Sequence, residues 1–232
     1  MLNPIFLIAR DLPDAWFQAV DTLLAVGRKF KIDKGSYEGQ DRLEYDYITV
    51  SIMYPGSRPL SPDIPPQFGI PNPTSDKYIE EDYLPYIMED VKKSGEYYTY
   101  GTYIKPQMNE IMKRYKKIFE ETGGYRSNQE HIIIGDYRDH LSMPDPPCLR
   151  SIDTRIQDNK LHFFIYFRSW DLWGGFPANL GGLQLLKEYM AIEIGVEDGE
   201  MIVASKGLHL YKYVWELAKL RTSHLNFDLD KR

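Results

Sequence analysis

The single cysteine of the chain, Cys148, stands where a thiol can act as a nucleophile. Two prolines precede it at the mouth of a predicted hairpin, a rigid edge that can present a thiol. Cationic neighbours favour the reactive thiolate, and three arginines are close in the sequence, namely Arg150, Arg155 and Arg168. A lone cysteine is otherwise commonly a small buried apolar residue. The surroundings of Cys148 make that interpretation less favoured without excluding it.

A second group of polar residues occupies the segment from 168 to 179, RSWDLWGGFPAN. Arg168 and Ser169 end a predicted strand, and a forked guanidinium beside a hydroxyl suits a phosphate group. Asp171 offers a directional acceptor, and the Asn179 amide could hydrogen-bond the edge of a base. In the structural interpretation, Asn179 caps a helix and Asp171 accepts loop amides. The residue types alone leave both interpretations open.

His209 and Tyr211 form the third candidate group. Residues two apart share a face of a strand, so this pair could jointly hydrogen-bond a hydroxylated ligand. An isolated histidine is also commonly a satisfied structural residue. The sequence has no HxxxH, CxxC or acidic metal-binding spacing, and it therefore predicts no metal site.

The elements that must position these groups mix helix and strand without a βαβ rhythm, which predicts an α+β fold. Hydrophobic periodicity predicts helices over residues 14–30, 75–92, 105–121 and 179–194. Alternation predicts strands over 43–54 and 131–135 and a hairpin of 149–157 with 160–169. Pro85 should kink or divide its helix, while Gly181 and Gly182 permit close packing of theirs. Seven prolines among residues 55–75 predict an ordered connector or an active-site loop.

Length and composition limit the class of protein. The 232 residues can bury one sizeable core, and we expect a single domain over residues 1–232. A net charge of −6 disfavours a general nucleic-acid surface, although a local basic pocket for a small phosphate is compatible with it. The apolar runs are too short to span a membrane, and Arg10 and Asp11 come too early for a signal peptide. We therefore expect a soluble cytoplasmic protein.

Four motifs in one order give the sequence a specific resemblance. They are Pro-Pro-Cys148, Arg168-Ser-x-Asp171, Gly-Gly-Phe-Pro-Ala-Asn179 and His209-x-Tyr211. In order and spacing this series resembles the thymidylate synthase family and its relatives, the pyrimidine nucleotide hydroxymethylases, and the chain looks most like the compact archaeal thymidylate synthases. The resemblance implies a single-domain α+β fold with a mixed sheet and packed helices.

The resemblance also implies how the nucleotide is held. Cys148 would add to C6 of the pyrimidine and thereby make C5 a nucleophile toward a one-carbon unit. Arg168 and Ser169 would hold the 5′-phosphate, and Arg168 would in addition favour the thiolate. His209 and Tyr211 would hold the 3′-hydroxyl of the deoxyribose.

Base recognition and proton transfer are implied in the same way. Asn179 would pair with O4 and N3 of the base, which favours dUMP over dCMP because cytosine reverses that edge. Tyr100 matches the family tyrosine that helps remove the C5 proton through water. Asp171 would hydrogen-bond the pterin cofactor and ordered water. For the family's glutamate near O4, Glu81 is the candidate and Glu80 the alternative.

The cofactor side and the partner subunit supply the remaining candidates. Trp170 and Trp173 would either exclude water or stack on the pterin. The family's phosphate-binding arginines come from the partner subunit of a homodimer. Arg126 is the candidate for that role here, and Arg42 or Arg58 are alternatives. The homodimer implied by the resemblance would pack flat sheet faces together.

The implied activity is thymidylate synthesis, in which dUMP is methylated at C5 and a reduced methylene-pterin gives carbon and hydride. Only residues 212–232 follow Tyr211, where the familiar enzymes continue into a tail over the folate. The donor is therefore expected to be 5,10-methylene-tetrahydrofolate or 5,10-methylene-tetrahydromethanopterin. The alternative enzyme is a dUMP, dCMP or CMP hydroxymethylase, which uses the same adduct and ends with water. A nucleotide-binding module without chemistry would not need Cys148.

Overall fold

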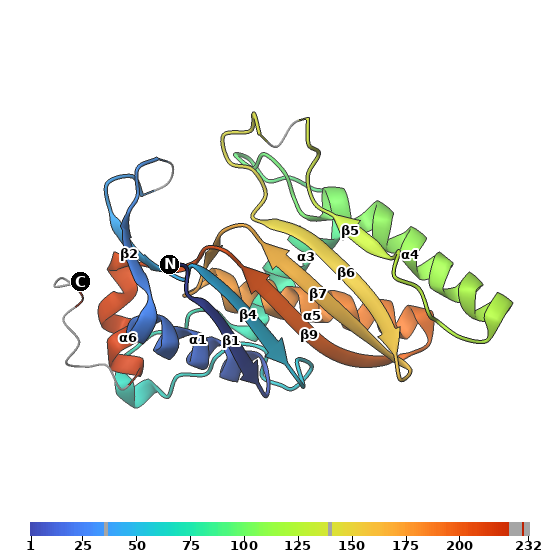
Figure 1. Ribbon diagram of the computed structural model, residues 1–232, viewed down its shortest axis with the longest axis horizontal. Helices are drawn as coiled ribbons and strands as arrows, with labels where there is room; N and C mark the ends of the chain where they lie inside the picture. The colour runs from blue at the N-terminus through green and yellow to red at the C-terminus, as the bar shows by residue number, and fades with distance from the viewer. Residues whose placement is uncertain (35–36, 139–140, 223–228, 230–232) are drawn as a thin grey trace.

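Two β-sheets organise the chain, which the computed structural model describes over residues 1–34, 37–138, 141–222 and 229. The larger sheet has six strands in the order β1-β4-β9-β7-β6-β5 (Figure 1). Their bounds are Pro4–Ala9 (β1), Tyr47–Ile52 (β4), Glu197–Ser205 (β9), Lys160–Phe167 (β7), Leu149–Gln157 (β6) and His131–Ile133 (β5). The β1–β4 and β7–β9 pairings are parallel and the others antiparallel, so the sheet is mixed.

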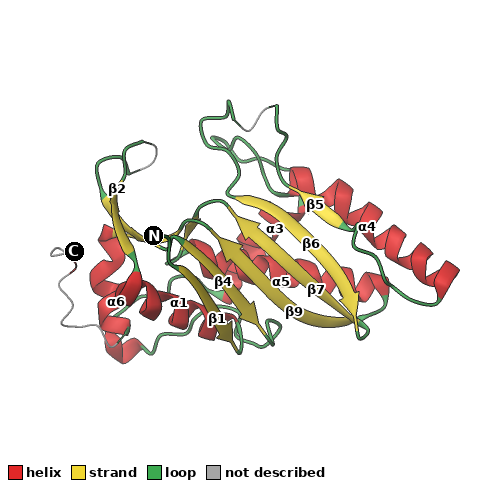
Figure 2. Cartoon of the chain, in the orientation of Figure 1, coloured by secondary structure: helices red, strands yellow, loops and turns green. Residues whose placement is uncertain are grey.

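Helices cover one face of this sheet (Figure 2). They include α1 (Leu12–Val26), α4 (Gly101–Thr122) and α5 (Gly175–Ile194). Alternate strand residues face the helices and form the core; in β7 these are Leu161, Phe163, Ile165 and Phe167. α5 is buried on most of its circumference, which explains its apolar sequence. Within the described ranges, every helix is too short or too polar to cross a membrane.

A smaller sheet brings distant segments of the chain together. Its strand order is β2 (Arg28–Lys31), β3 (Asp41–Glu44), β10 (Leu208–Tyr211) and β8 (Trp170–Asp171). His209 of β10 lies opposite Asp171 of β8, and Tyr211 lies opposite Arg42 of β3. His209 and Tyr211 are thus on one strand, which is the condition under which they share a face, and they lie beside the 168–179 segment. A turn, η3 (Lys212–Val214), and a helix, α6 (Trp215–Arg221), follow.

Some predicted boundaries are wrong. The strand predicted over 43–54 is two strands, β3 and β4, which belong to different sheets. The helix predicted to reach residue 30 ends at Val26, because the residues after it pair as β2. The helix predicted from residue 179 begins at Gly175, and strands β1 and β9 were not predicted. The β6–β7 hairpin is confirmed, and Asp158 and Asn159 turn it with φ of 52° and 59°.

The helical segment from 76 to 88 is divided, as Pro85 predicts. It consists of α2 (Asp76–Tyr78), one wider turn η2 (Ile79–Tyr83) and α3 (Leu84–Met88). Ser75 caps it, since its hydroxyl accepts a hydrogen bond from the backbone N of Tyr78 at 3.1 Å. Pro85 has no N–H to give to the preceding turn, and the wider turn lies directly before it. The preceding proline-rich segment is irregular apart from a short turn, η1 (Pro66–Phe68).

Two glycines of α5 pack closely against this helical segment. A Cβ at Gly181 would meet Ile79 Cδ1 at 2.6 Å, and a Cβ at Gly182 would meet Ile87 Cδ1 at 2.6 Å and Tyr83 Cδ1 at 2.9 Å. The close packing predicted from the glycine pair is therefore confirmed. Its partner is the face of the 76–88 segment that carries Tyr83.

We expect Gly182→Ala to destabilise the protein by about 1–3 kcal/mol, because side chains of α3 and η2 must move to admit a methyl group. Helix propensity acts in the opposite direction by about 1 kcal/mol, so the sign of the change tests the contact. Urea unfolding measures it. Gly124→Ala is the control, because a Cβ at Gly124 would meet no described atom within 4 Å, and its expected change is within about 0.5 kcal/mol. A Gly182→Ala protein as stable as wild type would contradict the contact.

Candidate active site

Cys148 lies directly before β6, where β6 and β7 meet at one end of the larger sheet. Its carbonyl accepts a hydrogen bond from Arg168 N at 2.9 Å, which ties it to the end of β7. The next backbone amide, Leu149 N, donates to Tyr100 Oη at 3.2 Å. Tyr100 precedes α4 and is 6% exposed. The structure therefore brings the predicted nucleophile and the predicted Tyr100 together.

The charges around Cys148 act as predicted, but burial outweighs them. Arg168 and Arg150 lower the pKa of the thiol, whereas burial, the largest effect, and Asp145 raise it. The net direction is upward, so two of the three arginines favour the thiolate as predicted, but burial has the larger effect. Arg155 also differs from expectation: it lies near the far end of β6 and its guanidinium is 5.4 Å from the Phe164 ring.

Arg168 is positioned by the two prolines that precede the cysteine. Its Nε donates to Pro147 O at 3.1 Å, and its Nη2 donates to Pro146 O at 2.5 Å. These bonds hold the guanidinium beside Cys148 and leave further N–H groups for an anion. Ser169 follows it and is half-buried. The geometry is compatible with the predicted phosphate contact.

Asn179 lies in the first turns of α5, with its side-chain amide held from both ends. Trp170 Nε1 donates to Asn179 Oδ1 at 2.6 Å. Asn179 Nδ2 in turn donates to Tyr83 Oη, from the facing helical segment. Because Asn179 is inside the helix, it does not cap it. The capping alternative raised by the sequence is thus wrong.

Tyr83 links the amide to the thiol, and the sequence analysis missed it. Burial raises the pKa of Tyr83 well above its usual value, and Cys148 contributes in the same direction. Its ring lies 5.8 Å from that of Tyr86, which in turn packs edge-on against Tyr100. The glycine pair of α5 was a usable signal, because it predicts that some helix face packs there and Tyr83 is on that face.

Asp171 binds the start of α5. Its carboxylate accepts hydrogen bonds from three backbone amides, Gly175 N at 2.9 Å, Gly174 N at 3.0 Å and Trp173 N at 3.3 Å. This is the loop-amide alternative that the sequence left open, and it is confirmed. A negative charge also suits the N-terminus of a helix. Contact of Asp171 with a pterin stays a prediction.

His209 is a buried histidine whose two ring nitrogens have different surroundings. Its Nδ1 lies 2.8 Å from Gly207 O, so Nδ1 carries the proton in the neutral ring and Nε2 is the acceptor. Nε2 is buried and has no hydrogen-bond partner in the part of the chain that is described. Burial lowers the pKa of His209 to about 4, and the Tyr211 ring packs edge-on against it at 4.7 Å. A neutral acceptor of this kind suits a ligand hydroxyl.

The lowered pKa of His209 makes a component of stability depend on pH. Between its folded pKa of about 4 and its unfolded value of 6.5, the unfolded chain binds more protons, so stability falls as pH falls through that range. We expect the stability advantage of wild type over His209→Gln to shrink by about 2 kcal/mol from pH 7 to pH 5. Urea unfolding at both pH values measures this. A difference that does not change with pH would contradict the shift.

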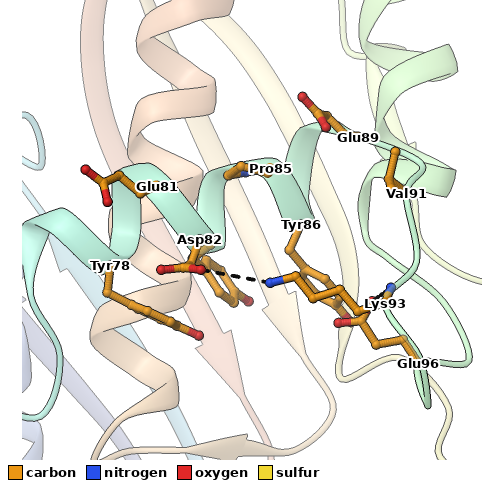
Figure 3. Close-up of a pocket in the computed structure, with 10 residues that line it drawn as sticks. Tyr78, Glu81, Asp82, Pro85, Tyr86, Glu89, Val91, Lys93 and Glu96 are labelled. Atoms are coloured by element: carbon orange, nitrogen blue, oxygen red, sulfur yellow. Dashed lines mark hydrogen bonds and ion pairs between the residues drawn. The ribbon is translucent and has the colours of Figure 1, made fainter.

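Two predicted residues have no hydrogen bond to this cluster within the described ranges. Glu81 lines a cavity together with Tyr83 and Tyr86, but its side chain is 65% exposed and pairs with Lys77 at 3.9 Å, and its carboxylate points away from the Tyr86 ring (Figure 3). Arg126 is exposed and lines a hollow beside the β6–β7 turn. That turn is at the opposite end of β6 from Cys148, roughly 30 Å along a strand of this length.

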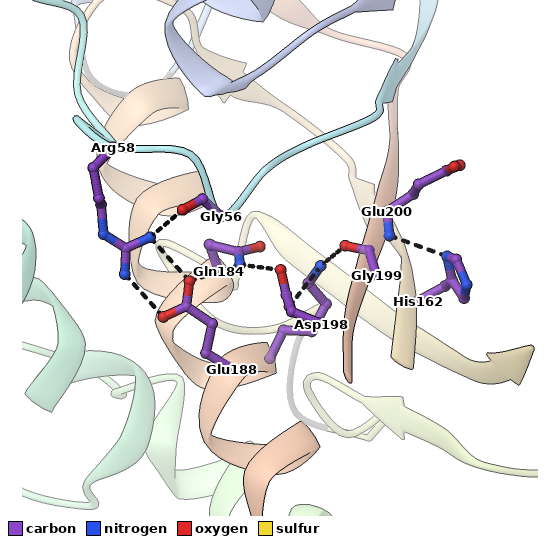
Figure 4. Close-up of polar contacts among 9 residues, drawn as sticks. Gly56, Arg58, His162, Gln184, Glu188, Asp198, Gly199 and Glu200 are labelled. Carbon is purple, nitrogen blue, oxygen red and sulfur yellow. Dashed lines mark hydrogen bonds and ion pairs between the residues drawn. The ribbon is translucent and has the colours of Figure 1, made fainter. Parts of the chain in front are cut away.

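The two alternative arginines, Arg58 and Arg42, lie in different parts of the structure. Arg58 makes a two-pronged contact with Glu188 of α5, with both N–O distances at 2.9 Å (Figure 4). Arg42 pairs with Glu44 at 2.7 Å, and its charge contributes to lowering the pKa of His209. Arg42 therefore lies at the candidate site, whereas Arg58 is engaged at α5.

The two tryptophans predicted to contact the cofactor, Trp170 and Trp173, lie in the core. Trp170 is 3% exposed and stacks on Phe167 at 3.9 Å, with Phe176 against it at 4.6 Å. Trp173 is 8% exposed and packs edge-on against Trp16. Their stacking on a pterin stays a prediction.

Two cavities that share Tyr78 and Tyr83 adjoin the cluster. One, of about 600 Å³, extends between Asn179 and residues 72–75, so the proline-rich segment borders the candidate site. The other, of about 460 Å³, is lined in part by Tyr86 and is the one in Figure 3. Asn179 thus lines one of these cavities, and Tyr83, which accepts its hydrogen bond, lines both.

Comparison with known proteins finds relatives of this chain. The model of the family described as thymidylate synthase matches residues 90–228. A Methanosarcina acetivorans protein provisionally named thymidylate synthase is 25% identical over 221 residues, 91% of each chain. A Methanothermobacter thermautotrophicus protein with the same provisional name is 24% identical over 218 residues, 87% of this chain and 91% of its own. A thymidylate synthase of Staphylococcus haemolyticus is 29% identical over 114 residues, 49% of this chain and 36% of its own.

Proposed function

The chain belongs to the thymidylate synthase family, and from this premise we propose that it methylates dUMP at C5 to form dTMP. One observation carries the proposal. Asn179 Nδ2 donates to the buried Tyr83, and Cys148 lies near enough to the same tyrosine to raise its pKa. This supports a single site, because a thiol that attacks C6 and an amide that pairs with O4 and N3 must meet the same base.

The residues of the cluster act on different parts of the nucleotide. Cys148 Sγ bonds to C6, so that C5 becomes the nucleophile. Arg168 and Ser169 hold the 5′-phosphate, and His209 Nε2 accepts the 3′-hydroxyl with Tyr211 beside it. Each has the chemistry for its part. Within the described residues, the Arg168 guanidinium donates to two proline carbonyls and so has N–H groups left for an anion, and His209 Nε2 has no hydrogen-bond partner.

Two tyrosines and one glutamate are the candidates for moving protons. Tyr100 lies next to Cys148 through Leu149 N, and burial keeps its phenol neutral by raising its pKa. It can relay the C5 proton through water. Tyr83 is equally protonated and reaches the Asn179 amide, so it is a candidate for the proton at O4. Glu81 is the candidate from the sequence.

The donor is a reduced methylene-pterin, which supplies the one-carbon unit and the hydride when bound. A flat ring fits the cavity whose walls include Tyr78, Tyr83 and Tyr86, since aromatic faces stack on such rings. Asp171, at the start of α5, is the candidate to hydrogen-bond the polar edge of the pterin. Trp173 is the candidate for the wall of the pterin site beyond Asp171. Folate and methanopterin donors share the pterin that these residues would meet.

We propose a homodimer in which the outer faces of the larger sheets meet. That face carries exposed apolar side chains, among them Phe6, Ile8 and Ile133, which are 62%, 58% and 57% exposed. Arg126 is too far from Cys148 of its own chain to meet the same phosphate, so a role for it at the phosphate requires the partner subunit's site. Gel filtration at micromolar concentration should show a dimer, and a strict monomer would count against this assembly.

Product analysis tests the activity. dUMP and dCMP are offered separately with methylene-tetrahydrofolate or with methylene-tetrahydromethanopterin, and the products are identified by mass spectrometry. We expect dTMP from dUMP with one of the donors, which also identifies the donor. A hydroxymethylated nucleotide would instead assign the chain to the hydroxymethylases. No product from either nucleotide would contradict the proposal.

A further inference from the structure

The amide of Asn179 has two orientations of nearly equal shape, and they read different bases. Uracil presents a donor at N3 and an acceptor at O4, whereas cytosine presents an acceptor at N3 and a donor at N4. A freely rotating amide serves either edge by turning over. Discrimination between the two nucleotides therefore requires that something fix the orientation.

Trp170 supplies a group that can fix it. An indole N–H only donates, so it can face Oδ1 of the amide but not Nδ2. Trp170 Nε1 lies 2.6 Å from Asn179 Oδ1. The indole itself cannot follow a turning amide, because it is 3% exposed and stacked on Phe167 with an interplanar angle of 8°. The donor is thus rigid and its acceptor is specified.

Tyr83 holds the other end of the amide. Asn179 Nδ2 donates to Tyr83 Oη, so the side chain is held at both its oxygen and its nitrogen. For dUMP, the substrate of the proposed function, Oδ1 must accept from N3–H and Nδ2 must donate to O4. One fixed orientation of the amide can serve this uracil edge or the cytosine edge, but not both.

We propose that Trp170 is a specificity-determining residue whose indole N–H holds the Asn179 amide in the orientation that accepts uracil and rejects cytosine. The inference rests on the proposed function, because it presumes a pyrimidine nucleotide at this site. To bind cytosine, the amide must turn over, which sets the Nδ2 donor against the indole donor. A buried N–H is then left without an acceptor, which disfavours the cytosine complex.

Trp170→Phe removes the N–H and retains an aromatic ring against Phe167 and Phe176. Dissociation constants for dUMP and dCMP are measured by titration calorimetry on the full chain. We expect the preference for dUMP to fall by about 10–100-fold in this variant, mainly through tighter binding of dCMP. Trp215→Phe is the matched control, because it removes another buried indole N–H, one that donates to the backbone carbonyl of Leu210, and its preference should equal that of wild type.

The ratio of the dissociation constants for dCMP and dUMP distinguishes specificity from a structural role. A loosened site weakens the binding of both nucleotides together and leaves this ratio unchanged. A wild-type preference for dUMP that persists in Trp170→Phe would overturn the inference and leave the proposed function standing. A wild-type chain that binds neither nucleotide would overturn both.

A measurement on wild type does not depend on the variant's folding. The chain has four tryptophans, so four indole N–H signals are expected in a ¹⁵N spectrum. With dUMP bound, the Trp170 signal should exchange slowly with solvent, because its hydrogen bond is retained. Exchange as fast as that of an exposed indole would overturn the inference.

Discussion

Cys148→Ala is expected to abolish turnover of dUMP while the chain stays folded. The alanine removes the only atom of residue 148 that can bond to C6, and the reaction has no second nucleophile at that position, since Cys148 is the single cysteine. We expect the rate of dTMP formation to fall by at least about 10⁴-fold. Release of the C5 hydrogen to solvent, measured with 5-tritiated dUMP, should be lost together with product formation.

Two controls separate lost chemistry from a lost site. Cys148→Ala should bind dUMP with an affinity near that of wild type, because phosphate, ribose and base contacts come from other residues. Cys148→Ser retains the shape with a weaker nucleophile and should also be inactive or nearly so. Turnover that persists in Cys148→Ala would exclude the covalent route and with it the assigned role of this residue.

The reactivity of the thiol shows where sequence reasoning reaches its limit. The basic neighbours of Cys148 were visible in the sequence, and two of them, Arg150 and Arg168, do lower the pKa of the thiol. Burial was not visible, because it depends on how distant segments pack around residue 148. Since burial is the larger effect, the net direction could not be predicted from the charges alone.

The site residues that the sequence predicted were all predictable for the same physical reason. Cys148, Arg168, Asn179 and His209 belong to short motifs whose spacing is readable, and the hairpin that carries Cys148 and Arg168 follows from simple alternation. Even there, composition left Asp171 open between a ligand contact and a loop contact. Only the three amides at its carboxylate decided for the loop contact.

Tyr83 was missed for the opposite reason. Its hydrogen bond to Asn179 joins residues 96 apart in sequence, and no local period records such a pair. The sequence predicted the helix, its division at Pro85 and the permissive glycines of α5, but not that the two would meet. It also assigned the proton at O4 to Glu81 from a weak local similarity, whereas the structure places that carboxylate on an exposed surface.

The comparison of Tyr83→Phe with Glu81→Gln decides between these two residues. Burial raises the pKa of Tyr83, so the phenol stays protonated at neutral pH and can donate to a developing charge at O4. We expect Tyr83→Phe to lower kcat for dTMP formation by about 10²-fold or more, as for loss of a general acid. Glu81→Gln should change kcat by less than about threefold, because the charge is exposed and its ion pair with Lys77 is screened by solvent.

Steady-state rates for dUMP at pH 7 measure both effects, with Tyr97→Phe, at an exposed tyrosine, as the matched control for loss of a phenol. A larger effect on kcat than on KM identifies proton transfer, because mere positioning of Asn179 would weaken binding of the base in the ground state as well. If Glu81→Gln instead lost activity by about 10²-fold and Tyr83→Phe kept it, the carboxylate would be the acid. In that case the 76–88 segment would have to turn Glu81 inward when the nucleotide binds, since its carboxylate now faces solvent.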